Sequence, residues 1–225
     1  MKKKNFVIPL VCLILSLTGI LSMTFLRTGF LYQLCSLNGS DPSNLIKYSG
    51  IWFKYNPNVN SLSAVVRANN PMYIFYNTLE DRQVYTKEYF KKSASFSEQF
   101  LDLYKTEKPY ENNITYVIQG SEEISYMQCY IFSLYLAGEN DKAISNFENY
   151  FDNIEDENLY IILSHCKSFI SYVYNNSQNE QDKERLTEIL NKYCERINNY
   201  NPKDSVRFVF ENLTAPNELM YTITE

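Results

Sequence analysis

The chain begins with one long apolar run and continues with shorter stretches in which apolar residues recur every three or four positions. Residues 6–26 contain no charged side chain, and this run lies between three lysines and Arg27. A helix of 21 residues is about 32 Å long, which matches the hydrocarbon core of a bilayer. The pattern therefore predicts a transmembrane helix, a signal-anchor, within residues 1–27.

The basic residues precede this run, so the positive-inside rule places the N-terminus in the cytoplasm and the remaining chain on the other side of the membrane. A cleaved secretory signal peptide is the alternative, because it also starts with basic residues. The run is longer than an ordinary signal core, and only Ser22-x-Thr24 resembles a cleavage site. We therefore expect a single-pass membrane protein with an extracytoplasmic domain, or a secreted protein if the segment is cleaved.

After the anchor, residues 28–60 are expected to connect it to the body of the protein. They are punctuated by Gly, Asn and Pro, and they contain a short predicted helix at residues 44–55 with the only tryptophan, Trp52. Residues 61–213 are predicted to form a helical domain, and residues 214–225 a C-terminal tail. Scarce Gly and Pro agree with an all-α fold.

Helical spacing is clearest from residue 121 to residue 200. It predicts a helix that starts at Ser121, a tight break at residues 137–140, and a second helix from Asp141. A third helix is expected from residue 155 to about residue 174, and a fourth to about residue 199. Earlier helices are predicted around Leu62–Val65–Val66, at 72–79, and after Thr86, which is placed to cap the helix that follows. Residues 112–120 are strand-like, and the pattern leaves the conformation of residues 205–225 open.

Residues 133–151, SLYLAGENDKAISNFENYF, resemble the middle of a tetratricopeptide repeat. Gly138 matches the turn between the two helices of the repeat, and Ala143 matches the small residue at their close contact. Ile144 and Phe147 match positions that pack on the next repeat. One clear unit spans residues 124–154, and the following helix pair echoes it loosely, with Cys129 and Phe132 aligned to Cys166 and Phe169.

The resemblance implies stacked helical hairpins that present a binding face to a peptide or a partner helix. An ordinary helical bundle containing one repeat-like hairpin is the alternative. Two or three stacked units fit the length of the chain, and such units bury one another's apolar faces.

Charge excludes some partners. Beyond Arg27 the chain has 26 acids and the 17 Lys and Arg that remain, a formal charge of −9. Nucleic-acid binding requires concentrated positive charge, so we expect no nucleic-acid partner. This net negative charge also disfavours tight adsorption of the whole domain to anionic lipid.

The sequence offers little catalytic chemistry, and we predict no enzyme, no cofactor and no metal site. The only histidine, His165, adjoins Cys166, and neighbouring side chains on a helix diverge by about 100°, which prevents the usual dyad. Four cysteines follow the anchor at positions 35, 129, 166 and 194, without a C-x-x-C spacing for zinc. They allow three disulfide pairings, among which the sequence does not choose.

These observations predict a membrane-anchored, extracytoplasmic helical domain that binds or scaffolds another protein. The alternative is an extracytoplasmic sensor of a ligand or signal. Aromatic residues are favoured at interfaces, and the residues considered for a binding groove, or equally for the core, are Tyr126, Tyr130, Phe132, Tyr135, Tyr160 and Tyr172.

Overall fold

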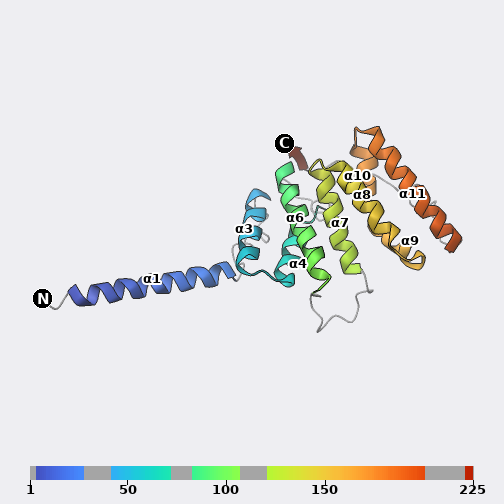
Figure 1. The fold of residues 1–225 in the computed structure, drawn as a ribbon. Coiled ribbons are helices and arrows are strands. Elements are labelled where there is room, and N and C mark those ends of the chain that lie inside the picture. The colour runs from blue at the N-terminus through green and yellow to red at the C-terminus, as the bar shows by residue number, and fades with distance from the viewer. Residues whose placement is uncertain (1–3, 28–41, 72–82, 107–120, 201–220, 225) are drawn as a thin grey trace.

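The computed structural model describes residues 4–27, 42–71, 83–106, 121–200 and 221–224, and within these ranges the chain is predominantly helical. Helix α1 (Lys4–Arg27) extends away from a body in which the other helices stand side by side, roughly in chain order (Figure 1). The all-α prediction is confirmed. The predicted helix at residues 72–79 and the strand-like residues 112–120 lie outside the described residues.

The first part of the body consists of α3 (Pro42–Tyr55), α4 (Val59–Ala68) and α6 (Lys87–Tyr104). Asn58 caps α4 by accepting a hydrogen bond from the Ser61 amide, and Thr86 caps α6 by accepting one from the Tyr89 amide. These caps satisfy amides that a helix N-terminus leaves without partners. The predicted cap at Thr86 is confirmed.

The next two helices, α7 (Ser121–Leu136) and α8 (Asn140–Asp152), form the predicted hairpin. Gly138 has φ +85°, and its amide donates to the Tyr135 carbonyl while the Glu139 amide donates to the Leu134 carbonyl. This arrangement ends α7 in the left-handed conformation that glycine adopts most easily. The sequence therefore placed this turn correctly.

The third predicted helix is in fact two helices, α9 (Asp156–His165) and α10 (Lys167–Asn176), followed by α11 (Glu180–Tyr200). The Cys166 amide donates to the Leu163 carbonyl, three residues back, instead of the residue four back that an α-helix uses. This tight turn separates α9 from α10. The apolar spacing of residues 155–174 continued through the break and gave no sign of it.

A two-stranded parallel sheet joins distant parts of the chain. β1 (Gln83–Thr86) pairs with β2 (Tyr221–Thr224), with Gln83 opposite Tyr221 and Thr86 opposite Thr224. Figure 1 shows β2 beside the N-terminal end of α6. The segment that the sequence left open thus contains at least one short strand, at its C-terminal end.

The main core runs through α6, α7, α8, α9, α10 and α11, and α7 lies at its centre. Nearly every described side chain of α7 is buried, because α4, α6, α8, α9 and α10 all pack against it. The largest fully buried side chains include Phe90, Phe132, Phe147, Phe169 and Tyr193. A smaller cluster, including Leu62, Val66, Phe100 and Tyr126, lies between α4, α6 and α7.

Aromatic residues of α7 and α10 contact one another at a constant spacing along the chain. Phe132 of α7 and Phe169 of α10 are 37 positions apart, and their rings meet edge to face with centroids 6.0 Å apart. Tyr135 and Tyr172, also 37 positions apart, meet in the same manner at 6.0 Å. These two contacts join α7 to α10.

Candidate functional site

Helix α1 carries apolar side chains that the body does not cover. Its described side chains, residues 11–23, are all exposed, and Leu15, Ile20 and Leu21 are between 63% and 66% accessible. The Thr18 hydroxyl donates to the Ile14 and Leu15 carbonyls within the helix, so it needs no partner from solvent. Among the residues that could be searched, no helix is long and apolar enough to cross a membrane.

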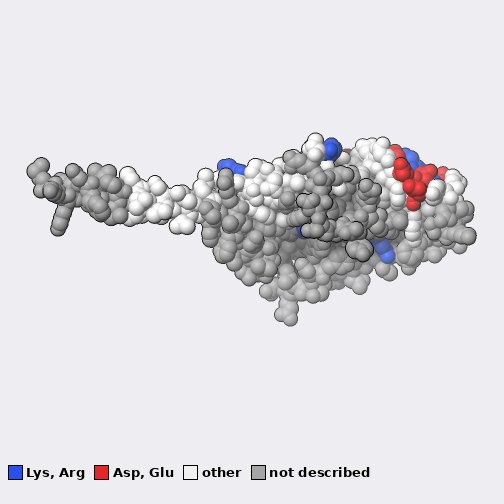
Figure 2. All heavy atoms as spheres, turned by 90° about the horizontal axis from the view of Figure 1, so that it is seen from below, with Lys and Arg blue, Asp and Glu red and all other residues white. Residues whose placement is uncertain are grey.

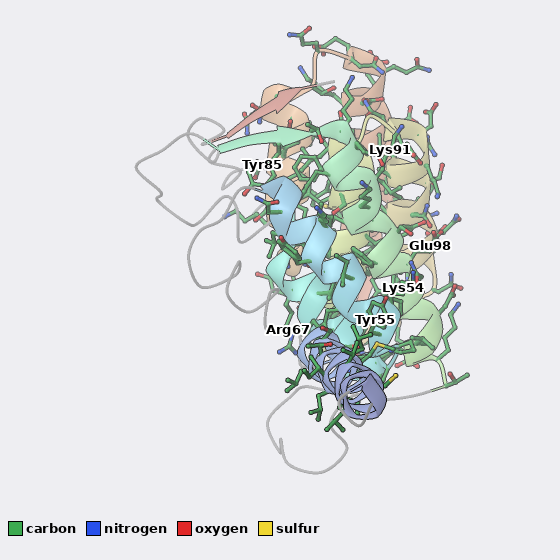
Figure 3. The ribbon with its side chains drawn as sticks, turned by 90° about the vertical axis from the view of Figure 1, so that its left-hand side faces the viewer. Lys54, Tyr55, Arg67, Tyr85, Lys91 and Glu98 are labelled. Atoms are coloured by element: carbon green, nitrogen blue, oxygen red, sulfur yellow. The ribbon has the colours of Figure 1, made fainter. Side chains whose placement is uncertain are left out.

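The body meets α1 through α3, which packs against it. In Figure 3, which views the molecule from the α1 side, Lys54, Tyr55 and Arg67 lie beside α1, whereas Tyr85 and Lys91 lie toward the opposite end. Along α3, Ile46 and Ser49 are buried, while Lys47 and Lys54 are exposed. α3 therefore turns one face to the body and another to solvent.

The aromatic residues considered for a groove are mostly core residues. Tyr126, Tyr130, Phe132, Tyr135 and Tyr172 are buried, and only Tyr160 is half-buried. Burial raises the pKa of Tyr172 to about 12. In the described part of the chain these side chains fill the interior between helices, so they do not line a binding groove.

The tyrosine hydroxyl groups are nevertheless paired. Tyr126 accepts a hydrogen bond from Arg67 Nε at 2.9 Å and also bonds Ser63. Tyr130 donates to Glu98 Oε1 at 2.8 Å. The pKa of Tyr130 is raised, mainly by burial and to a smaller extent by this carboxylate. Each buried ring thus directs its hydroxyl to a charged partner, Arg67 or Glu98, that is itself exposed, and buried tyrosines usually have such a hydrogen-bond partner.

A buried carboxyl group joins three elements near the start of α11. Asp182 is only 4% exposed, and it accepts hydrogen bonds from Tyr135 (2.9 Å), Asn140 (2.7 Å) and Asn179 (2.9 Å). Burial is the main cause of the raised pKa of Tyr135, whose hydroxyl faces this carboxylate. This cluster was not predicted from the sequence. A signal existed, because Asp182 occupies a position on the apolar stripe that continues through Leu186, Ile189, Tyr193 and Ile197.

A second buried polar cluster centres on Asn69, just after α4. Its side-chain amide donates to Ser49 Oγ at 3.1 Å, and its side-chain oxygen accepts from Tyr89 at 2.9 Å. Ser93 donates to the Asn69 carbonyl and contacts Ser133 Oγ at 3.1 Å. These groups connect α3, α4, α6 and α7, and they satisfy one another's hydrogen bonds, which makes a structural role the direct explanation.

Salt bridges line the contact between α8 and α11. Lys192 lies 2.7 Å from Asp152, and Arg185 lies 3.6 Å from Asp141. Arg196 contacts Asp156 at 2.7 Å and also donates to the Phe151 and Ile154 carbonyls at the end of α8. Arg196 thereby joins α11 to the end of α8 and to the residues that follow it.

The described cysteines are thiols and form no disulfide with one another. Cys129 and Cys166 are buried, Cys194 is half-buried, and Cys12 is exposed on α1. Burial raises the pKa of Cys129 to about 12, so its thiol stays protonated at neutral pH. His165 is the last residue of α9, directly before Cys166. No cluster of three or more His, Cys, Asp or Glu suited to a metal ion occurs within the described ranges.

Comparison with known proteins identifies no relative. The sequence matches no known protein family, no curated protein is significantly similar to it, and no solved structure resembles it significantly.

Proposed function

We propose that this chain is a membrane-anchored helical-repeat protein that holds a partner protein outside the cytoplasm. The proposal depends chiefly on α1, whose apolar side chains are exposed while the body buries its own. The described side chains of α1 cover residues 11–23, and the sequence extends the uncharged run to residues 6–26. At 24 residues α1 is about 36 Å long, enough for a bilayer core of about 30 Å.

A bilayer would also remove the apolar side chains of α1 from water. Leaving a large aliphatic side chain in water forgoes about 1.5–3 kcal/mol of burial free energy, and α1 exposes eight such side chains: Val11, Leu13, Ile14, Leu15, Leu17, Ile20, Leu21 and Met23. The lysines at positions 2–4 favour a cytoplasmic N-terminus. The body then lies on the extracytoplasmic side.

Protein binding is the activity that best fits the body. Successive helix pairs stack through residues 37 positions apart, and stacks of this kind expose extended surfaces on which partners bind. Within the described part of the body, Tyr200 is the large hydrophobic side chain that is well exposed. The partner contacts that we propose on this surface are therefore mainly polar.

Membrane insertion is tested on the full chain by alkaline extraction of membranes and by adding protease to intact cells. The native protein is expected to resist extraction, and external protease is expected to digest its body. A Leu13→Lys/Leu17→Lys variant places two charges near the middle of α1, at a cost of about 2.5–3.5 kcal/mol each, and should be extracted. Leu13→Ala/Leu17→Ala is the matched control. Extraction of the native chain would contradict the anchor.

Partner binding is tested by placing a photo-crosslinking amino acid at Asp141, Asn149 or Glu188, which are exposed on α8 and α11. A specific protein should be captured in intact membranes and should then bind the purified full chain. The control joins residues 1–27 to an unrelated domain. If both chains capture the same proteins, or if the captured protein does not bind the purified chain, the scaffolding proposal fails.

A further inference from the structure

The part of the body nearest α1 carries only positive charge. Residues 42–71 contain Lys47, Lys54 and Arg67 and no acid, and Asp41 is the single acid between residues 28 and 71. By contrast, residues 121–200 contain 14 acids and 6 Lys and Arg. Figure 2 shows acidic side chains gathered at the end of the molecule opposite α1. The described body is therefore basic beside α1 and acidic at its other end.

The solvent-facing side of α3 combines this charge with aromatic rings. Lys47 and Tyr48 are followed seven residues later by Lys54 and Tyr55, which places both pairs on one side of the helix. In each pair the ammonium nitrogen lies 5.8 Å from the centre of the tyrosine ring. Trp52, which is half-buried, also belongs to this helix.

The position of α3 suits contact with a membrane. It packs against α1 and runs across the end of that helix in Figure 1, and Figure 3 places Lys54, Tyr55 and Arg67 beside α1. Tyr and Trp concentrate at the headgroup level of bilayers, where their rings contact acyl chains and their polar groups contact water. Lysines near an anionic surface gain roughly fivefold in association each.

We propose that the outer face of α3, together with Arg67 of α4, rests on the anionic lipid headgroups of the membrane that α1 enters. The inference depends on the proposed anchor. Anionic lipid attracts the basic end of the body and repels its acidic end, so the two contributions favour the same orientation. The protein is then held with α3 against the bilayer and with α11 directed away from it.

Trp52 is the only tryptophan in the chain, so its fluorescence reports on α3 alone. The full chain is reconstituted into phosphatidylcholine vesicles with or without phosphatidylglycerol, and flotation confirms that it is in the membrane. With phosphatidylglycerol, brominated lipid should quench Trp52 more strongly and aqueous acrylamide less strongly. High salt should reverse both changes, since screening shortens to about 3 Å at 1 M.

A Lys47→Gln/Lys54→Gln variant should float normally, but phosphatidylglycerol should no longer change its Trp52 quenching. Because each lysine contributes roughly fivefold, the ratio of molecules with α3 on the bilayer to molecules with α3 free should fall roughly 25-fold. Adding Arg67→Gln should weaken the contact of α3 with the bilayer further. Because Arg67 also donates a hydrogen bond to Tyr126, circular dichroism must first show that this triple variant has the native fold. The control, Lys142→Gln/Lys167→Gln/Lys183→Gln, removes three positive charges from α8, α10 and α11, as many as the triple variant removes. Its Trp52 quenching should still respond to phosphatidylglycerol.

The outcomes separate this inference from the anchor. If the native chain floats but Trp52 quenching is the same with and without phosphatidylglycerol, the headgroup contact is wrong and the anchor stands. The same holds if the double variant responds to phosphatidylglycerol as the native chain does. If the native chain fails to float, both the anchor and the headgroup contact are overturned.

Discussion

At the scale of single residues, Asp182 shows how this protein accommodates a polar group in its interior. Its carboxyl group is buried where α7, α8 and α11 meet, and hydrogen bonds from Tyr135, Asn140 and Asn179 replace the water that it loses. A buried donor that loses its acceptor costs more than the hydrogen bond contributes on balance. Asp182 therefore matters mainly through the donors that depend on it.

Replacing Asp182 with Ala should destabilise the body by about 1–3 kcal/mol, because three donors lose their acceptor. Urea unfolding of the full chain in detergent micelles, followed by circular dichroism, measures the change. Glu184→Ala, at an exposed position on the same helix, is the control and should alter stability by less than about 0.5 kcal/mol. Equal effects of the two substitutions would show that the buried cluster is unimportant.

Gly138 is a second position at which one residue type is needed. With φ +85°, a Gly138→Ala substitution should cost about 1–2 kcal/mol from backbone strain. The added methyl group itself has room, since its nearest neighbour is Lys87 Cδ at 3.9 Å. Thermal unfolding should therefore show a lower Tm.

Gly50→Ala provides the matched comparison. Gly50 lies inside α3, and an added Cβ would lie 3.5 Å from Phe96 Cζ, an ordinary contact. Replacing a helical glycine with alanine stabilises by about 0.5–1 kcal/mol when space allows. The two glycine variants should thus shift Tm in opposite directions, and a shift in the same direction would argue against strain at Gly138.

At the scale of elements, the contact between α8 and α11 combines an apolar stripe with charged residues along its edge. Phe147 and Phe151 of α8 meet Tyr193 of α11, with ring centroids 6.4 and 5.4 Å apart. Beside them, Lys192 bonds Asp152, and this contact is the main cause that lowers the pKa of Asp152 below its ordinary value of 3.8. A group with a lowered pKa in the folded state stabilises folding at pH values above the unfolded pKa.

The stabilisation from Asp152 should therefore be complete at neutral pH and should be lost as the pH falls below about 3.8 through the lowered folded pKa. Asp152→Asn should reduce Tm at neutral pH, and the difference from the native chain should shrink in acid. Thermal melts across this pH range measure it. Glu195→Gln serves as the control on an exposed position of α11. A difference that stays constant with pH would contradict the prediction.

Apolar spacing predicted most of these elements, because burial of one face leaves a pattern in the sequence. Leu186, Ile189 and Tyr193 are all buried as expected, and the turn at Gly138 was predicted from residue type. The break at Cys166 has no Gly or Pro to reveal it. Two of the three partners of Asp182, Tyr135 and Asn140, lie more than 40 positions away, which a local pattern cannot identify. The choice between groove and core for the candidate aromatic residues stayed open for a related reason, since spacing does not distinguish a core tyrosine from a surface one.

At the scale of the whole molecule, Phe169 joins α10 to both α7 and α8. Its ring contacts Phe132 at 6.0 Å, Tyr135 at 5.8 Å and Phe147 at 5.6 Å between centroids. These partners belong to α7 and α8, whereas Phe169 belongs to α10. Removal of this ring should therefore weaken the packing of α10 against both helices.

Phe169→Ala should cost about 3–5 kcal/mol and should loosen α9, α10 and α11 before α6 and α7. Hydrogen exchange measured by mass spectrometry on the full chain should show faster exchange in residues 156–200 than in α6. Tyr150→Ala, at a half-buried position on α8, is the comparison and should have a smaller effect. Uniform acceleration throughout the body would instead indicate that the helices unfold as a single unit.

The pairing of β1 with β2 affects how the protein is made. Gln83 finds its partner in Tyr221, which leaves the ribosome 138 residues later. The amino acids of α6 to α11 are all translated in that interval, so these helices can fold before the sheet closes. A transcript cut short ahead of codon 221 would still encode the helices, but β1 would lack the strand with which it pairs.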